Sequence, residues 1–322
     1  MDMISFGSVF LELVFGHVHE LPRPGEEVFT DDFAISCGGA AVTSASAAAR
    51  GGAHAGLCTV LGDDLGSRLV REHCARLGVE LSPSTRVRRR SAGISAVLNY
   101  DGDRAFITYI PPRPAGTQPE VARWRDVLRR EQPRWCYLHA DWGVADFLRE
   151  ARKLGAKVVL DISLGDERNR DMVIDCVRLA DIFVPNQDEL LRLTGADTVG
   201  EAVASALGWG TPLVVKRGAA GALVADPGGI TEVAEGVKSV QVRDLTGAGD
   251  AFAGAMIAAL LRGAPLRAAV VAANEAGSEA VSLLGAMGEV EAGGLVTAGR
   301  ELGEMFPGNA ARPAAQRTEA DR

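Results

Sequence analysis

The stretch 244–254 constrains the fold of this chain more than any other. Apolar residues alternate before it, over 237–242, and the segment 251–261 is apolar nearly all round and stops before Gly263. This pattern predicts a strand, then a glycine-rich turn, then a buried helix. The turn is the part of the unit that leaves backbone groups uncovered, so it is the first candidate for function.

The predicted turn has the features of an anion site. Gly247, Ala248 and Gly249 leave backbone N–H groups uncovered at a helix start, where the helix dipole is positive. Asp250 follows directly, and a carboxylate there opposes anion binding unless it takes a proton from a hydroxyl that attacks phosphorus. The alternative is a plain glycine-rich turn with Asp250 as a helix N-cap.

The letters DLTGAGDAFAGA in this stretch resemble the C-terminal signature of the ribokinase/PfkB family of carbohydrate kinases, usually written D-T-x-GAGD-x-F. The resemblance implies an ATP-dependent sugar kinase, a phosphotransferase with an alcohol group as acceptor, that uses Mg²⁺. Asp250 is then the general base, and the turn 247–249 is the anion hole for the transferring phosphoryl group. Asp244 and Thr246 match the family's monovalent-cation loop, so activation by K⁺ is expected.

A second signature lies near the N-terminus. Gly38 and Gly39 open a small-residue helix that runs to about Arg50, and they either expose backbone donors or admit close packing. The segment resembles the family's Gly-Gly-x-x-x-Asn, and these residues are candidate substrate contacts. Thr43 stands where the family usually has Asn, and a hydroxyl cannot present an amide's donor and acceptor together. This departure concerns the choice of substrate rather than the reaction.

A small sheet is predicted beside the main fold. The segments 94–100 and 104–110 alternate and flank Asp101-Gly102, a strong hairpin signal, and 28–35 alternates weakly. In the family such strands form a lid over the sugar, which is expected here from about 10–36 and 93–111.

Two lid residues are candidate substrate contacts. Glu12 falls where the family usually has an acidic sugar-binding residue, commonly Asp, and the alternative is an ordinary surface Glu. Arg104 begins the second strand of the predicted hairpin and is the other candidate.

From about residue 124 onward, strands alternate with helices. The predicted strands are 135–139, 158–162, 182–184 and 212–215. The predicted helices are 144–154, 172–179, one that follows 185–189 and runs to Leu193, and 269–281. This order predicts an α/β fold with a doubly wound, mostly parallel sheet flanked by helices. Together with the lid, it is the ribokinase-like architecture that the resemblance implies.

Three polar residues lie at or near the carboxyl ends of predicted strands, where ligands bind in such sheets. They are Asp161, Asn186 and Glu189, which are expected to converge in space. Asn186 and Glu189 match the family's N-x-x-E element, which organises Mg²⁺ and phosphate through water. The alternative for Glu189 is the acid of a local capping box.

A nucleotide loop is expected after the strand that ends near Val215. Lys216 stands where the family's T-x-G-x-x-G has Thr, and a lysine can contact a phosphate as a point charge. Gly218 and Gly221 are candidates because a nucleotide lying over backbone needs the missing side chains. Asn274, on the last predicted helix, is the candidate for the edge of the adenine pocket.

Composition and absent motifs exclude other classes. The formal net charge of −8 gives no global basic field for nucleic acid or an acidic membrane, and no apolar run is as long as a membrane span. The five cysteines are scattered without a Cys-x-x-Cys pair, which favours a reduced, cytoplasmic protein. A P-loop kinase or a dehydrogenase is disfavoured, because neither a Walker A motif nor a complete G-x-G-x-x-G after a strand is present.

The expected organisation is one kinase domain over 1–308 and a disordered tail over 309–322. The lid strands are apolar on both parities, which predicts a homodimer joined through the lids. A sugar is the favoured substrate, and ribose, ketoses, 2-keto-3-deoxy sugar acids and nucleosides remain open. The alternatives are a nucleoside kinase of the same family and a non-catalytic sugar or nucleoside sensor.

Overall fold

A computed structural model of the chain describes residues 1–89, 91–100, 102–112, 120–140, 144–163, 169–226 and 228–288. All of them belong to one compact unit, Met1–Glu289. Asp101 of the predicted hairpin, the predicted domain limit at 308 and the predicted tail 309–322 lie outside the described residues.

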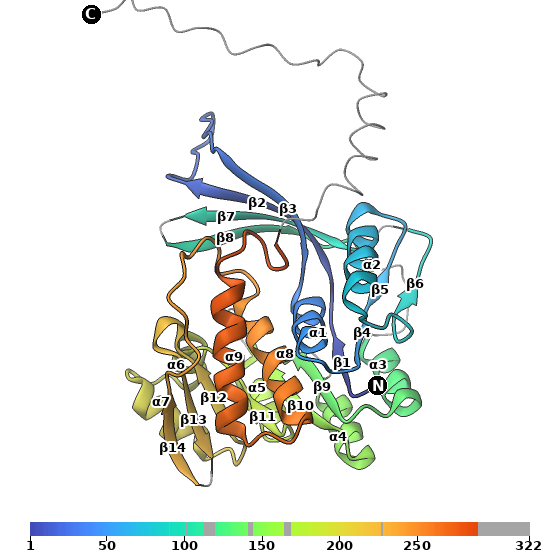
Figure 1. Cartoon of the computed structure of the whole chain (residues 1–322), viewed down its shortest axis with the longest axis vertical. Coiled ribbons are helices and arrows are strands. Elements are labelled where there is room, and N and C mark those ends of the chain that lie inside the picture. Colours follow the sequence, from blue (N-terminus) through green and yellow to red (C-terminus); the bar gives the residue numbers. More distant parts are fainter. Residues whose placement is uncertain are drawn as a thin grey trace, which may run out of the picture. The chain divides into compact units, whose positions relative to one another are not determined.

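The described residues form a main sheet of eight strands, which is parallel from β4 to β12 and has an antiparallel edge of two strands (Figure 1). In spatial order the strands are β14 (Gly229–Val233), β13 (Ala222–Asp226), β12 (Leu213–Lys216), β11 (Ile182–Phe183), β10 (Lys157–Asp161), β9 (Trp135–His139), β1 (Met3–Phe6) and β4 (Ala55–Cys58). The mostly parallel sheet confirms the predicted fold class.

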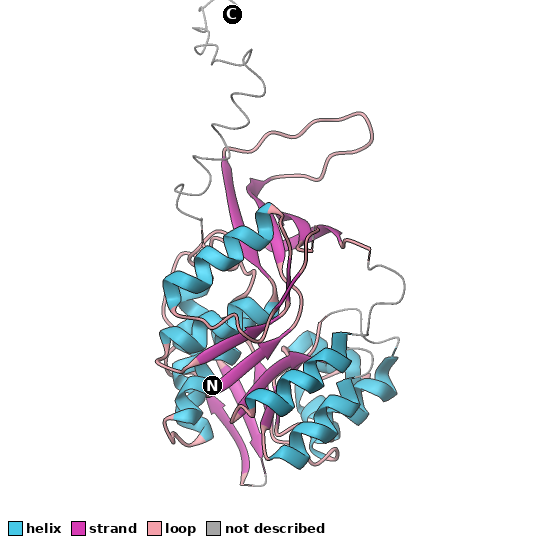
Figure 2. Cartoon of the chain, turned by 90° about the vertical axis from the view of Figure 1, so that its right-hand side faces the viewer, coloured by secondary structure: helices cyan, strands magenta, loops and turns pink. Residues whose placement is uncertain are grey.

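Helices cover both faces of this sheet (Figure 2). One face carries α1 (Ala40–Arg50), α8 (Ala248–Leu261) and α9 (Leu266–Ala280). The other carries α3 (Glu120–Glu131), α4 (Val144–Leu154), α5 (Arg170–Val177), α6 (Gln187–Thr194) and α7 (Val199–Leu207). Side chains along a strand alternate between the two faces, so Tyr137 of β9 packs on the α8 side while its neighbour Leu138 packs on the other.

A separate four-stranded sheet confirms the predicted small sheet. Its strands in spatial order are β3 (Asp32–Gly38), β2 (Phe10–Val18), β7 (Gly93–Tyr100) and β8 (Asp103–Tyr109). Helix α2 (Leu65–Leu77) packs against β2, β3 and α1, and the short strands β5 (Val60–Leu61) and β6 (Thr85–Arg86) pair nearby.

The two faces of the small sheet differ in chemistry. A row on one face brings together Glu12, Ser36, Ser95 and Thr108, with 2.9 Å between the two hydroxyls of Ser95 and Thr108. On this same face, Leu284, from the segment that follows α9, packs against Val14, Ala34 and Val97 next to the row. The small sheet therefore presents a polar row towards the carboxyl ends of the main strands.

The strand predicted over 237–242 is wrong. This segment has no strand structure, and Val242 is 59% exposed. The chain instead runs beside α9, where the backbone N–H of Lys238 donates to Ser278 and that of Arg243 donates to the carbonyl of Val281. Apolar alternation produces a strand only where a partner edge is available, and here the chain follows a helix instead.

Candidate active site

The site is built on the glycine turn at the start of α8. Gly247 is the N-cap residue, with a φ of 77°, and a Cβ at this position would lie 2.7 Å from the Cβ of Ala286. Only glycine combines this left-handed conformation with so close an approach. The turn is thus packed directly against the chain segment that follows α9.

The side chain of Asp244 joins the glycine turn before α8 to the segment that follows α9. One oxygen of its buried carboxylate accepts hydrogen bonds from the backbone N–H and the hydroxyl of Thr246, at 2.9 and 2.7 Å. The other oxygen accepts from the backbone N–H of Gly285 at 2.8 Å. These side chains organise the loop, and a role of the loop in binding K⁺ stays a prediction.

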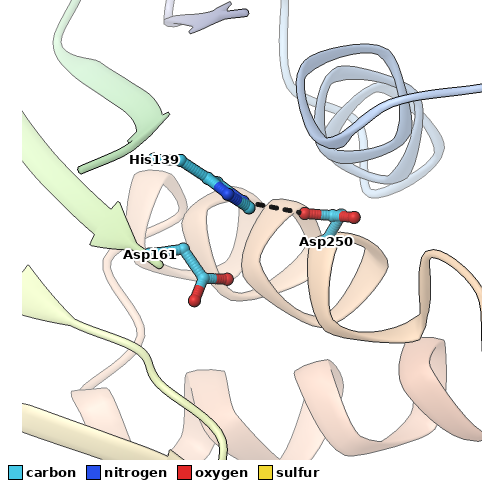
Figure 3. Close-up of side chains that lie close together, drawn as sticks. All are labelled: His139, Asp161 and Asp250. Carbon is cyan, nitrogen blue, oxygen red and sulfur yellow. Dashed lines mark hydrogen bonds and ion pairs between the residues drawn. The ribbon is translucent and has the colours of Figure 1, made fainter. Parts of the chain in front are cut away.

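Asp250 lies in the first turn of α8, and its side chain points to β9 instead of capping the helix. Its Oδ1 atom accepts a hydrogen bond from the hydroxyl of Tyr137 at 2.6 Å. The same oxygen lies 3.4 Å from Nε2 of His139, the contact that the dashed line marks in Figure 3. The N-cap alternative is therefore wrong, because Gly247 is the N-cap residue and no side chain caps this helix.

Asp161 and Lys216 lie at the carboxyl ends of β10 and β12, beside Asp250. The ammonium of Lys216 donates to Oδ2 of Asp161 at 2.7 Å, and the side chain of Lys216 is 14% exposed. A Cβ on Gly249 would lie 3.0 Å from this ammonium, so the positive charge lies against the glycine turn. Burial opposes the charge, but Asp161 and Glu189 raise the pKa of Lys216 and keep it protonated.

Asn186 and Glu189 form the capping box of α6. The Asn186 side chain accepts from the backbone N–H of Glu189 at 2.8 Å, and the Glu189 carboxylate accepts from that of Asn186 at 2.7 Å. The local alternative is thus present in the structure. Burial, reinforced by the nearby charge of Asp161, raises the pKa of Glu189 to about 7. The metal role of Glu189 stays a prediction, and its carboxylate lies near enough to Asp161 for the two charges to interact.

The charges around Asp250 keep it ionised. Burial opposes ionisation, but the hydrogen bonds from His139 and Tyr137 and the charge of Lys216 hold the pKa of Asp250 below its usual value. Burial, with both aspartates added, raises the pKa of Tyr137 well above its ordinary range, so its hydroxyl keeps its proton. At His139 burial favours the neutral ring, but Asp250 and Asp161 outweigh it and raise the pKa.

Glu12 enters the site from the small sheet. It is 5% exposed, which rules out the surface alternative, and its carboxylate lies where a side chain on Gly38 would be. Its Oε2 atom accepts from the backbone N–H of Ala286 at 3.3 Å. Burial raises the pKa of Glu12 to about 7 against the effect of that bond, and the charges of Asp244 and Asp250 add to the rise.

The other candidates for substrate contact lie around this carboxylate or on the small sheet. Gly39 is the N-cap of α1 with a φ of 110°, and a Cβ there would meet the carbonyl of Ser8 at 2.5 Å. The hydroxyl of Thr43, buried on α1, has no hydrogen-bond partner among the described residues. Arg104 is half-buried on β8 and its guanidinium donates to Asp103 at 3.1 Å.

The residues predicted to contact the nucleotide lie in different surroundings. Gly218 and Gly221 bound a short 3₁₀ turn after β12, next to Lys216. Asn274 is buried, and its amide donates to the carbonyls of Val233 at 2.9 Å and Glu235 at 3.0 Å. Both amide hydrogens thus anchor backbone, and a nucleotide contact of Asn274 stays a prediction.

Tyr137 and His139 were not predicted as site residues. His139 ends β9 as Asp161 ends β10, and the two residues are partners in the parallel register. The rule that placed Asp161 at the carboxyl end of a strand could therefore have indicated His139. Tyr137 carries no such signal, because a tyrosine within a strand resembles an ordinary core residue.

Comparison with known proteins agrees with this architecture. The model of the pfkB family of carbohydrate kinases matches residues 3–292, and the chain belongs to this family. It is 30% identical over 281 residues to a cytidine kinase of Thermococcus kodakarensis, covering 84% of this chain and 92% of that protein. It is 31% identical over 276 residues to an aminoimidazole riboside kinase of Salmonella typhimurium, covering 78% and 83%.

Among solved structures, the chain is similar to Arabidopsis thaliana ribokinase complexed with ribose and ATP, with a TM-score of 0.74. The identity is 24%, and the match covers 89% of this chain and 94% of that one. The ribokinase-like fold is thereby confirmed. Within the described part of the chain, no helix is both long enough and apolar enough to cross a membrane.

Proposed function

We propose that this protein transfers the γ-phosphoryl group of ATP to a hydroxyl of a sugar, with Asp250 as general base. One observation carries the proposal: an ionised carboxylate lies in the first turn of α8, beside the Lys216 ammonium that packs on the same glycine turn. A carboxylate weakens anion binding, so its presence at an anion site needs a reason. Removal of a proton from the hydroxyl that attacks the phosphoryl group is such a reason.

In the proposed mechanism, the acceptor hydroxyl lies at Asp250, which takes its proton as the oxygen attacks phosphorus. The backbone N–H groups of the turn 247–249 and the ammonium of Lys216 stabilise the charge that develops on the transferring group. The carboxylate of Glu189 is an oxygen donor of the kind that a hard cation prefers, and with Asn186 it would hold Mg²⁺ through water. Bound there, Mg²⁺ neutralises phosphate charge.

The acceptor is proposed to lie between the main unit and the small sheet, which acts as its lid. Glu12, with the polar row of its sheet, faces Gly38, and Gly39 and Thr43 follow on α1. The unpartnered hydroxyl of Thr43 supports this assignment, because buried polar atoms are rarely left without a partner. Arg104 completes the proposed set on β8.

The nucleotide is proposed to lie over the turn that follows β12, with contacts from Asn186, Lys216, Gly218, Gly221 and Asn274. The position of Lys216 supports this placement, since its ammonium lies between Asp161 and the glycine turn of α8. The same turn, with Gly249, would then meet the phosphates. Activation by K⁺ at the loop of Asp244 and Thr246 belongs to the same proposal.

A homodimer through the lids is also proposed. The face of the small sheet opposite the polar row is apolar: Ile107 pairs with Ala96, and Leu13 with Ile35, in one continuous row. Ile107 is 70% exposed and Tyr109 50%. Contiguous exposed apolar residues on a sheet favour a second surface that covers them.

A nucleoside is the second candidate for the acceptor. The cytidine kinase and the aminoimidazole riboside kinase, at 30% and 31% identity, are both named for ribosides. A sensor without catalysis, the third class, is disfavoured by the presence of Asp250 with its supporting hydrogen bonds.

The test is an ADP-release screen with Mg-ATP across sugars, sugar acids and nucleosides, followed by Asp250→Asn with the best acceptor. The substitution keeps the shape and removes proton acceptance, so turnover should fall by roughly 10² to 10⁴ while calorimetric ATP binding survives. Asp146→Asn, an exposed change on α4, is the matched control. Near wild-type turnover in Asp250→Asn would end the assignment of the base.

A further inference from the structure

We propose that Tyr137 is a positioning residue for the base: together with His139 it holds Oδ1 of Asp250, which leaves Oδ2 as the oxygen that takes the substrate proton. This proposal rests on the proposed role of Asp250. Tyr137 is fully buried in the middle of β9, so it acts through Asp250 and touches no substrate itself.

The Tyr137 hydroxyl lies at the centre of the polar cluster. Its oxygen is 2.6 Å from Oδ1 of Asp250, 3.0 Å from Nε2 of His139 and 3.2 Å from Oδ2 of Asp161. A hydroxyl has one hydrogen and two acceptor positions, so it can donate to only one of the two carboxylates at a time.

The choice between the carboxylates is decided by Lys216. Oδ2 of Asp161 already accepts a hydrogen bond from the Lys216 ammonium at 2.7 Å, which satisfies and neutralises that carboxylate. The contact of Tyr137 with Asp250 is also the shorter one, at 2.6 Å against 3.2 Å. The hydrogen of Tyr137 therefore belongs to Asp250.

His139 completes the arrangement. Its Nδ1 atom lies 2.9 Å from the hydroxyl of Ser163, which can donate to that nitrogen and place the ring proton on Nε2. Nε2 then donates to the Tyr137 oxygen at 3.0 Å, with Oδ1 of Asp250 at 3.4 Å. The imidazole thus supports the tyrosine and the aspartate from the same side.

Tyr137 donates to Oδ1 of Asp250, and Nε2 of His139 lies 3.4 Å from the same oxygen. Within the described residues, no side chain donates to Oδ2, and the Asp250 side chain is 20% exposed. The short hydrogen bond from Tyr137, whose hydroxyl is itself held by His139, fixes Oδ1 and leaves the other oxygen free to meet a substrate. Tyr137, which is 113 residues away from Asp250 in the sequence, thereby determines where Oδ2 lies. The position of Oδ2 in turn determines where the attacking hydroxyl must bind.

The test is Tyr137→Phe, which removes the hydroxyl and keeps the ring. Loss of a hydrogen bond to a charged group should lower kcat about tenfold, and the KM values for ATP and acceptor should stay within about twofold. Asp146→Asn, the exposed change on α4, is again the control and should leave both constants unchanged. A merely structural loss would raise KM as well.

A second readout is the titration of Asp250 itself, followed by carbon-13 NMR on carboxyl-labelled aspartate and assigned by the resonance missing in Asp250→Asn. Tyr137→Phe should raise its acid dissociation midpoint by about one pH unit, a tenfold change, because a donor to the ionised form is gone. If Tyr137→Phe does not fold, His139→Gln is titrated in its place and should move the midpoint in the same direction.

Two results would overturn the proposal: wild-type kcat in Tyr137→Phe, or an unmoved midpoint in whichever variant is titrated. These failures differ from failure of the proposed function. An active Asp250→Asn removes the base and the role of Tyr137 together. An inactive Asp250→Asn beside a fully active Tyr137→Phe removes only the role of Tyr137.

Discussion

Raising the pH from 6 to 8 is expected to increase kcat/KM for the acceptor about tenfold in the wild-type protein, and Glu12→Gln is expected to abolish this increase. The cause is the burial of Glu12 on the inner face of the small sheet, which raises its pKa to about 7. With that pKa, about a tenth of the carboxyl is ionised at pH 6 and about nine-tenths at pH 8. If the ionised form is the one that accepts hydrogen bonds from the acceptor, binding follows this fraction.

The raised pKa of Glu12 also makes the stability of the fold depend on pH. The pKa of Glu12 is about 7 in the fold and 4.5 as a free side chain, so protonation favours the folded state. That contribution is complete below pH 4.5 and is lost as the pH rises through about 7. The gap corresponds to about 3 kcal/mol, so Glu12→Gln should raise the free energy of unfolding at pH 8 by up to that amount.

The assay is the initial rate of ADP release with the acceptor varied at saturating Mg-ATP, at intervals from pH 6 to 8. Saturating Mg-ATP is used because the pKa of Glu189 is also raised to about 7; with the proposed nucleotide site filled throughout, the pH slope that remains reports on Glu12. Glu72→Gln, an exposed change on α2, is the control. A pH slope that persists in Glu12→Gln, or a lower melting temperature of that variant at pH 8, would refute the assignment.

Two further predictions concern the nucleotide side and the assembly. Lys216→Thr removes the ammonium that pairs with Asp161 at 2.7 Å, so the KM for ATP should rise about tenfold or more while acceptor KM changes little; an unchanged KM for ATP would place Lys216 outside the nucleotide site. Light scattering at micromolar concentration should give twice the chain mass of 33.8 kDa, and Ile107→Glu should give the single mass; a fully active wild-type monomer would contradict the lid dimer.

Much of the fold was predictable because its elements have strong local signals. The strand 135–139 and the helix 144–154 were predicted with the boundaries that the structure has. The run 57–61 is apolar apart from Thr59, yet it forms parts of two strands in different sheets, broken at Thr59. Helices α3 and α7 were not predicted. Which sheet a short apolar run joins depends on its partner strand, and local periodicity does not contain that information.

The site divides in the same way. Asp161, Glu189 and Lys216 could be predicted to meet, because the carboxyl ends of parallel strands share one edge of the sheet. The contact of Tyr137 with Asp250 joins positions 113 residues apart and depends on which face of β9 the tyrosine occupies. A strand that is buried on both faces has apolar residues throughout, so its sequence does not indicate which face contributes to a site.

Two residues of this chain that depart from the family pattern lie close to the proposed base. Lys216, in place of the usual threonine, puts an ammonium against Gly249 on one side of Asp250. Glu12, in place of the usual aspartate, reaches from the small sheet to Ala286, and its charge interacts with that of Asp250. The GAGD turn itself is kept between them. Because these two changes leave the GAGD turn intact, we expect them to affect how the acceptor and the phosphates are bound and to leave the chemistry proposed at Asp250 unchanged.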